Sequence, residues 1–504
     1  MFRNNWMIEG ILIGLNTALS LQNIIIVMIG CFAGTIIGML PGLGPMTAIA
    51  LMIPITYGFD PASGLILMAG VYYGAVFGGS TSSILLNAPG VPGTVATAFD
   101  GYPMAQQGKA GKALAIAAYS SFAGGTISAI FLLIAAPSLS KISLSFRSPD
   151  YFALMMLGLT AVSAFSSKGQ FLKAMMMVVL GLMLASIGQD SLSDISRFTF
   201  GNMNLSDGIS FVLIVMATFA MSEALTIIFR GKDPNRAAKQ ISLTELGSIK
   251  VNKEETIKMA KTIPRSSILG FLIGVLPGAG ATIASFLAYG MERNYVSDEE
   301  KEKFGKGSVH GLSAPETANN AACSGSFVPL LTLGIPGSGT TAVMLGALLG
   351  FGIQPGPRLY QTNPEIFWSV IMSMYIGMVV LLILNLPLIP YIARILAVPR
   401  NFLIPLILFF SITGIYLMSF NNFDIYLMIG IAVVATFLRL YEFPMPPLIL
   451  AFVLGKLIEE NLRRSLLISD GSFSFLWDRP LTLIILLITI GIVGWQIYRS
   501  LIRK

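Results

Sequence analysis

Charged residues, histidine and cysteine are scarce in this chain of 504 residues. Only 11% of its residues are charged and 54% are hydrophobic, whereas soluble domains carry about 25% charged residues. The two cysteines, Cys31 and Cys323, lie in apolar segments, and His310 is the only histidine. These shortages exclude a disulfide framework and any metal site built from several cysteines or histidines. The composition instead predicts an all-α polytopic membrane protein embedded in the lipid bilayer.

Motifs for catalysis and nucleotide binding are also missing. The chain contains no Gly-x-x-x-x-Gly-Lys-Ser/Thr sequence, no His-Glu-x-x-His sequence and no nucleophile elbow. We therefore expect neither an enzyme nor a bound cofactor. The net charge of +7 requires no nucleic-acid partner, because basic cytoplasmic loops of a membrane protein account for it.

One apolar pattern occurs twice, at 34–44 and at 270–280, and each copy ends in Pro-Gly-x-Gly. Proline removes a backbone donor and glycine permits left-handed geometry, so a helix should stop at each motif. Apolar arms on both sides of the motif predict two re-entrant hairpins, at 21–57 and 268–291. A simple helix kink is the alternative for one isolated copy, but duplication at matching places favours a binding site.

Two further apolar segments, 62–100 and 310–353, are interrupted by Pro-Gly motifs and are predicted to be helices broken near the middle of the membrane. Four spans follow each broken helix. The predicted organisation is an N-terminal span at 1–20, repeat 1 at 21–229, a basic cytoplasmic linker at 230–265, repeat 2 at 266–470, and a C-terminal span with a basic tail at 479–504.

The number of spans predicts how the repeats are oriented. Each repeat has five crossings, so the two copies face in opposite directions within a total of about twelve spans. With a cytoplasmic N-terminus, most loop lysines and arginines fall inside, as does the C-terminus. The exceptions, which fall outside, are Lys141, Arg147, Arg463 and Arg464. Inverted repeats with broken helices are typical of secondary transporters.

The hairpin tips and helix breaks are the predicted substrate site, because helix ends inside a membrane present unpaired N–H groups that attract anions. No arginine or lysine lies near the breaks in the sequence, so backbone amides, hydroxyls and co-bound cations would hold the anion. The candidate substrate-binding residues are Pro41, Gly42, Gly44, Asn87, Pro89, Gly90, Gly93, Thr94, Pro277, Gly278, Gly280, Pro336, Gly337, Ser338, Gly339 and Thr340.

Polar side chains cluster beside the breaks and are the predicted coupling-ion site. They are Ser80, Thr81, Ser82, Glu316, Asn319 and Asn320, where Na⁺ is a possible ligand. The alternative for the hydroxyls and amides is hydrogen bonding between helices. For Glu316 the alternative is a carboxylate near the interface, stabilised by the helix dipole. His310 is expected at the interface, and Asp100 in the turn that follows the first broken helix.

At these residues the sequence resembles the large membrane subunit of tripartite tricarboxylate transporters, the TctA family. The resemblance is carried by four motifs in order: Leu40 to Gly44, Gly78 to Gly90, Ala314 to Ala322, and Leu333 to Gly339. It implies a secondary transporter of the bacterial inner membrane that works with a small four-span membrane subunit and a periplasmic solute-binding protein. It also implies carboxylate uptake driven by a sodium or proton gradient.

The resulting hypothesis is symport of a di- or tricarboxylate and a cation into the cytoplasm. The hairpins and broken helices would move as one body against the remaining spans, in an elevator-like cycle of alternating access. Three rivals remain: a channel, an intramembrane enzyme, and a membrane subunit that assembles the system without transporting. Polarity concentrated at the two breaks, rather than along open stripes, disfavours the channel.

Overall fold

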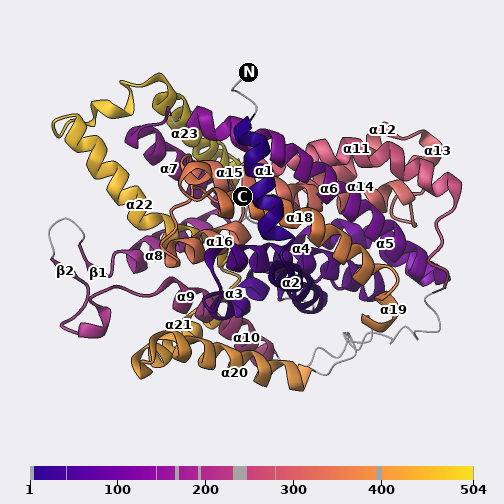
Figure 1. Ribbon diagram of the computed structural model, residues 1–504, viewed down its shortest axis with the longest axis horizontal. Coiled ribbons are helices and arrows are strands. Elements are labelled where there is room, and N and C mark those ends of the chain that lie inside the picture. Colours follow the sequence, from indigo (N-terminus) through magenta and orange to yellow (C-terminus); the bar gives the residue numbers. More distant parts are fainter. Residues whose placement is uncertain are drawn as a thin grey trace.

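Helices make up nearly all of the computed structural model (Figure 1). The structure describes residues 5–40, 43–143, 145–164, 170–190, 195–230, 247–278, 280–392 and 400–502. Within these ranges the strands are β1 (Gly188–Gln189) and β2 (Ser196–Arg197), which pair antiparallel. Six helices of the described part are long and apolar enough to cross a membrane, and several shorter apolar helices accompany them. The predicted class, an all-α polytopic membrane protein, is confirmed.

The first half of the chain contains α1 (Asn5–Ala18), α2 (Leu21–Met39), α3 (Gly44–Thr56), α4 (Pro61–Leu86), α5 (Val95–Met104), α6 (Ala110–Ser143), α7 (Ser148–Ala164), α8 (Phe171–Ala185), α9 (Phe211–Val215) and α10 (Ser222–Arg230). Short turns of other helix types are η1 (Pro92–Thr94), η2 (Ala105–Lys109), η3 (Met203–Leu205) and η4 (Met216–Met221).

The second half contains α11 (Lys253–Val275), α12 (Gly280–Tyr295), α13 (Asp298–Lys301), α14 (Val309–Gly325), α15 (Phe327–Leu333), α16 (Gly339–Gly350), α17 (Leu359–Thr362), α18 (Pro364–Asn385), α19 (Ile389–Ile392), α20 (Arg400–Ser419), α21 (Asn422–Leu440), α22 (Pro446–Ile468), η8 (Phe473–Leu476) and α23 (Pro480–Ile502).

The two Pro-Gly-x-Gly motifs end helices in the same way. Both α2 and α11 stop at a leucine with extended backbone, Leu40 at φ −79° and Leu276 at φ −76°. The second arms α3 and α12 then start at Gly44 and Gly280, whose φ angles of +65° and +63° favour glycine. The first arm of the second hairpin is longer than expected: α11 begins at Lys253, inside the predicted linker, where a capping box from Asn252 starts it.

The two broken helices also end alike, each in a left-handed residue. α4 is followed by Asn87 at φ +50°, and α15 by Gly334 at φ +69°. The chain resumes as helix at η1 and α5 in the first case, and at α16 in the second. Ser338 caps α16 by accepting a hydrogen bond from the Thr341 backbone N–H at 3.2 Å.

The first arm of each hairpin packs on the broken helix of its own half through glycines four residues apart. A Cβ at Gly34 of α2 would lie 2.3 Å from the Val71 carbonyl oxygen of α4, and a Cβ at Gly270 of α11 would lie 2.4 Å from the Ala318 carbonyl oxygen of α14. Small residues at this spacing allow helix backbones in a membrane to approach closely. Most of α4 is buried, so it forms the centre of the molecule.

Two outer groups of helices border this centre. α7, α8, α22 and α23 pack together in one group, and α10, α20, α21 and η4 form the other. In Figure 1 they lie on the left and at the bottom, whereas α11 to α14 lie on the right.

Candidate functional site

Glu316 of α14 is fully buried and receives hydroxyl groups from three other helices. Ser80 Oγ of α4 lies 2.8 and 2.7 Å from the two carboxylate oxygens, and Ser121 Oγ of α6 lies 2.7 Å from Oε2. Thr97 of α5 donates to Oε1. Among the described residues no lysine, arginine or histidine forms an ion pair with this carboxylate. Glu316 lies in the body of α14 rather than in its first turn, and its partners are hydroxyl groups of other helices.

A buried carboxylate without a positive partner is costly, since its charge has left water without compensation. Two chemical states remove that cost: a proton on the carboxyl group, or a cation bound between the carboxylate and nearby oxygens. Hydroxyl groups suit both states, because each has one O–H donor and two acceptor lone pairs and can bond a charged or a neutralised carboxyl group. The arrangement around Glu316 is chemically suited to bind a coupling cation.

Asn319 and Asn320 lie on the same helix and extend this polar region toward the first helix break. Asn319 Nδ2 donates to the Gly93 carbonyl oxygen at 3.3 Å, and Asn320 Nδ2 donates to Asn319 Oδ1 at 2.6 Å. Asn320 Oδ1 is buried and has no hydrogen-bond partner within the described ranges. Buried polar atoms normally have a hydrogen-bond partner. This unpaired oxygen is therefore available to accept a hydrogen bond or to ligate a cation.

The tip of the second hairpin contacts the second helix break directly. The Gly278 N–H donates to the Gly337 carbonyl oxygen at 3.0 Å. A Cβ at Gly280 would lie 3.8 Å from Ser338 Cβ. On its other side Ser338 Oγ lies 3.4 Å from the hydroxyl of Tyr72 in α4, so the break is held between hairpin and central helix.

The first break is held in the same manner. A Cβ at Gly90 would lie 1.9 Å from the Gly38 carbonyl oxygen near the end of α2, so only glycine fits there. Thr94 Oγ1 accepts from Ser83 at 2.8 Å and donates to the Val91 carbonyl oxygen at 2.9 Å. Ser82 Oγ donates to the Gly79 carbonyl oxygen at 3.1 Å.

The two halves meet at these segments. A Cβ at Gly93 would lie 3.4 Å from Ala281, next to the second hairpin tip, and a Cβ at Gly339 would lie 2.9 Å from Met46 Sδ in the first hairpin. The structure thus brings both breaks and both hairpins into contact.

The remaining candidates vary in position. Thr81 and Thr340 are buried, whereas Asn87 is exposed and Pro89 is half-buried. A Cβ at Gly44 would meet no atom within 4 Å. Pro277 and Pro336 immediately precede the contacting Gly278 and Gly337. Pro41 and Gly42 lie outside the described residues.

Thr97 and Ser121 are site residues that the sequence interpretation missed. Ser121 belongs to the pair Ser120-Ser121, which precedes Gly124-Gly125 in an otherwise apolar helix. A Cβ at Gly124 would lie 2.4 Å from the Thr317 carbonyl oxygen, so α6 approaches α14 closely there. In the sequence, the pair of hydroxyl residues beside two glycines was the pattern that could have indicated this close helix contact.

A second polar cluster joins the middle of α11 to the last turn of α12 and the first turn of α14. Glu292 is buried and bonded by Arg265 Nη2 at 2.6 Å, while His310 Nδ1 lies 3.2 Å from Glu292 Oε1. Asp100 was expected in a turn, but it lies inside α5. Its Oδ1 accepts from the backbone N–H groups of Gly305, Gly307 and Ser308, at 2.9, 2.9 and 2.7 Å. Glu292 thus has a positively charged partner, whereas Asp100, like Glu316, has none among the described residues and is bonded by N–H and hydroxyl donors.

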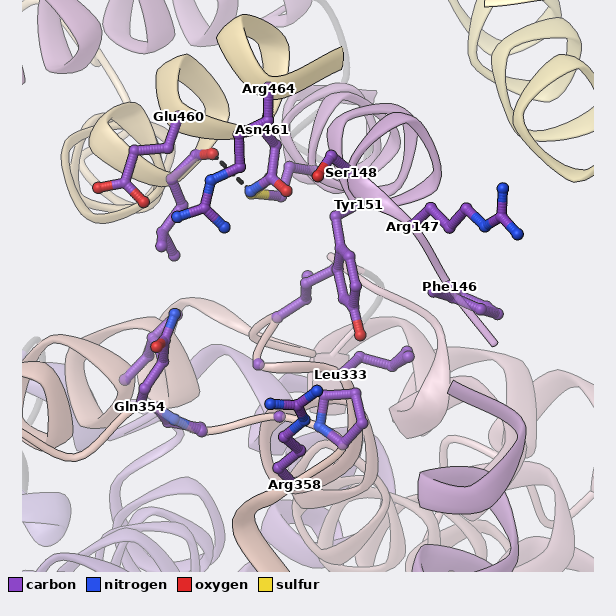
Figure 2. Close-up of a pocket in the computed structure, with 18 of the residues that line it drawn as sticks. Phe146, Arg147, Ser148, Tyr151, Leu333, Gln354, Arg358, Glu460, Asn461 and Arg464 are labelled. Carbon is purple, nitrogen blue, oxygen red and sulfur yellow. Dashed lines mark hydrogen bonds between the residues drawn. The ribbon is translucent and has the colours of Figure 1, made fainter. Parts of the chain in front are cut away.

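Arginines do approach the second helix break, although none is near it in the sequence. A cavity of about 590 Å³ is lined by Gly334 and Ile335 of the break and by Arg147, Arg358 and Arg464 (Figure 2). The expectation that cations stay away from the breaks is therefore wrong for this one. Arg358 follows the break after α16 and a loop, Arg147 directly precedes α7, and Arg464 lies near the end of α22, so only the fold brings them together.

The helical fold and its apolar spans are those of an all-α polytopic membrane protein. The family model described as "Tripartite tricarboxylate transporter TctA family" matches residues 24–450. The chain belongs to that family.

Two proteins of Agrobacterium vitis are similar to the chain. One, named "Uncharacterized 52.8 kDa protein in TAR-I ttuC' 3'region", is 41% identical over 498 residues, which cover 99% of this chain and 98% of that protein. The other, "Uncharacterized protein in TAR-II ttuC' 3'region", is 42% identical over 212 residues, covering 42% of this chain and 87% of that protein. No solved structure matches the chain.

Proposed function

We propose that this protein is the large transmembrane subunit of a tripartite importer that carries a di- or tricarboxylate together with Na⁺ or H⁺. Its partners would be a small four-span membrane subunit and a periplasmic solute-binding protein. It would reside in the bacterial inner membrane with both termini in the cytoplasm. Family membership supports a tripartite system with further subunits.

The observation that carries the proposal is Glu316, a buried carboxylate that has hydroxyl partners and, in the described part of the chain, no positively charged one. A cation would bind and neutralise this carboxylate during transport, and would dissociate from it on the other side of the membrane. The neighbouring Asn320 Oδ1, which has no partner among the described residues, supports the same location. The substrate carboxylates would be bound beside it by backbone N–H groups at the breaks and hairpin tips.

The contacts indicate which helices would move together. α6 is tied to α14 by Ser120 Oγ, 2.7 Å from Ser313 Oγ, and by Ser128 Oγ, which donates to the Ala321 carbonyl oxygen at 2.7 Å. Tyr73 of α4 likewise donates to Met374 Sδ of α18 at 3.4 Å. We therefore assign α6 and α18 to the moving part, which the sequence hypothesis had limited to hairpins and broken helices.

The inner body, as we name it, comprises α2 to α6, α11, α12, α14 to α16 and α18. The frame comprises α7 to α10 and α20 to α23. In the proposed cycle the inner body slides against the frame and exposes the site alternately to the two sides, as an elevator would.

Uptake into proteoliposomes containing all subunits tests the function. Radiolabelled citrate or succinate should accumulate when a sodium or a proton gradient is imposed, and comparison of the two gradients identifies the cation. Glu316→Gln should abolish gradient-driven uptake without loss of folded protein, because the hydroxyls can still bond the amide oxygen. Glu365→Gln, an exposed acid bonded to Thr17, is the matched control and should transport normally.

Gradient-driven uptake by Glu316→Gln at the wild-type rate would remove this residue from the coupling site. Uptake that survives deletion of the whole chain would favour the assembly role. Currents far above one charge cycle per substrate would favour a channel, and chemical turnover of a carboxylate by the purified protein would favour an enzyme.

A further inference from the structure

The cavity beside the second helix break, which we name the arginine vestibule, has the size and polarity of a small-molecule site. Its volume of about 590 Å³ falls in the range of roughly 300–1,000 Å³ that is usual for such sites. It lies between the ends of α7 and α22 on one side and the segment 354–358 on the other (Figure 2).

The lining carries an excess of positive charge. Arg147, Arg358 and Arg464 face a single carboxylate, that of Glu460. The acids nearby are already engaged: Asp190 and Glu459 pair with Arg463 at 2.7 and 2.5 Å. Asp150 pairs with Arg479 at 2.8 Å. Within the described ranges, Arg358 and Arg464 have neither an ion pair nor a hydrogen bond from their guanidinium groups, so both are available to an anion from outside.

The side chains are arranged around a shared space. In Figure 2 the guanidinium group of Arg464 points from α22 toward the opposite wall, where Arg358 lies below the hydroxyl of Tyr151. Gln354 and Asn461 add amide groups to the lining. Arg147 points away from this space. Two guanidinium groups on facing walls suit a ligand with carboxylates at both ends, since arginine binds carboxylates with paired N–H groups.

The vestibule adjoins the proposed substrate site, because the second helix break forms part of its wall. A Cβ at Gly334 would lie 2.5 Å from the Pro355 carbonyl oxygen, so the break touches the segment that carries Arg358. Ile335 lines the vestibule, and the next residues, Pro336 to Thr340, are those assigned to the substrate. An anion in the vestibule is thus adjacent to the break that would receive it.

The position of these arginines also calls for an explanation. α6 has 34 residues and is about 50 Å long at 1.5 Å per residue. It separates Lys109, at the end predicted to be cytoplasmic, from Arg147. Arg147 and Arg464 therefore stand at the end predicted to be external, where the positive-inside rule disfavours basic residues. An anion-binding role at that end accounts for Arg464, whose guanidinium group points into the cavity, but not for Arg147, which points away from it.

We propose that the arginine vestibule is an outer binding subsite, in which Arg358 and Arg464 hold a di- or tricarboxylate before it passes to the second break. This inference rests on the proposed function, because it takes the same substrate class and the same external side. It adds a cationic binding step to a site whose inner part relies on backbone amides.

Arginine modification tests the subsite without transport. The full chain in lipid nanodiscs is treated with phenylglyoxal, and the rate of modification at each arginine is read by peptide mass spectrometry. Citrate or succinate should slow modification of Arg358 and Arg464, but not of Arg147, and sulfate at equal ionic strength should protect less. Arg464→Gln should raise the citrate or succinate concentration that half-protects Arg358 by about tenfold. Arg147→Gln is the matched control and should leave that concentration unchanged.

Absence of protection by both carboxylates overturns the subsite, and so does equal protection by sulfate, which would indicate unspecific screening. Loss of uptake in Arg358→Gln/Arg464→Gln without carboxylate protection would assign the arginines to a docking face for another subunit and would also overturn it. The assay needs no gradient and no partner, so its outcome is separate from that of the proposed function. If the carboxylates protect the arginines but uptake fails, only the transport proposal is contradicted. If uptake occurs without protection, only the proposed subsite in the vestibule is contradicted.

Discussion

At Glu316, hydroxyl groups occupy the place that arginines occupy at two other buried acids, Glu292 and Asp150. Glu292 is paired with Arg265, and Asp150 with Arg479. An arginine fixed beside Glu316 would neutralise it permanently, and no exchangeable cation would be needed. Hydroxyls stabilise the carboxylate only in part, which leaves it dependent on a cation that can be released.

Ser121→Ala should tighten cation binding. The hydroxyl of Ser121 stabilises the ion-free carboxylate at 2.7 Å, and removing it makes that state less stable relative to the cation-bound one. The cation concentration for half-maximal uptake should fall about tenfold, since a hydrogen bond to a charged group contributes about 1.5–3 kcal/mol. Ser128→Ala, which removes an α6 hydroxyl bonded instead to the Ala321 carbonyl oxygen, is the control. Equal cation dependence in both variants would contradict the role of Ser121.

Asn320→Ala should weaken the dependence of uptake on the cation gradient. Its buried Oδ1 lacks a partner in the described part of the chain, and Asn385 Oδ1 of α18 shares that property. Both amides donate to the carbonyl four residues earlier, at 3.0 Å, so Asn385→Ala matches the helical setting away from the site. The half-maximal cation concentration should rise about tenfold in Asn320→Ala alone. If Asn319→Ala and Asn320→Ala both keep wild-type dependence, neither belongs to the ion site.

The sequence pointed to residues that cluster locally, and missed those that only the fold brings close. Ser80, Glu316 and Asn319 stand out because each is a polar residue within one of the two broken apolar segments. Ser121 lies in a continuous apolar helix, and Arg358 lies beyond the break in a loop. Their roles depend on which helices and loops face one another, and a local pattern does not contain that information.

At the scale of elements, both hairpins depend on the close approach of their first arms to the broken helices. The Pro-Gly-x-Gly motifs predicted two helix ends, and α2 and α11 do end where those motifs begin. The start of α11 was not anticipated, although Asn252 and Glu255 form a capping box that the sequence displays. Residues 253–265 are polar and basic, and for that reason they were predicted to be part of the linker.

Gly34→Ala and Gly270→Ala should each destabilise the protein. The added methyl groups would lie 2.3 Å and 2.4 Å from backbone carbonyl oxygens of the neighbouring helix, so the helices must separate. Such overpacking costs about 1–3 kcal/mol. Gly430→Ala in α21, where a Cβ meets no atom within 4 Å, should be neutral. The Tm values of the three variants in detergent would be measured by size-exclusion chromatography after heating. Equal Tm values would contradict the packing argument.

For the whole molecule, the decisive question is whether the inner body slides against the frame. α3 of the inner body borders α20 of the frame: a Cβ at Gly414 would lie 3.2 Å from Pro54 Cβ. Disulfides join Cβ atoms about 3.5–4.5 Å apart, so cysteines at both positions need only a small adjustment to form one. Within the inner body, a Cβ at Gly377 of α18 would lie 3.6 Å from the sulfur of the native Cys31 in α2.

Oxidation of Pro54→Cys/Gly414→Cys, in a chain with Cys31 and Cys323 changed to alanine, should stop uptake, and reduction should restore it, because the bond joins the two parts that move. Gly377→Cys, which keeps Cys31, is the matched control: its disulfide lies inside one body and should leave uptake intact. Cross-linking is measured by gel mobility after cleavage between the two positions, and uptake in proteoliposomes before and after reduction. Full uptake by the oxidised Pro54→Cys/Gly414→Cys variant would rule out sliding at this boundary. Loss of uptake in oxidised Gly377→Cys would instead show that α2 and α18 move apart and do not belong to one body.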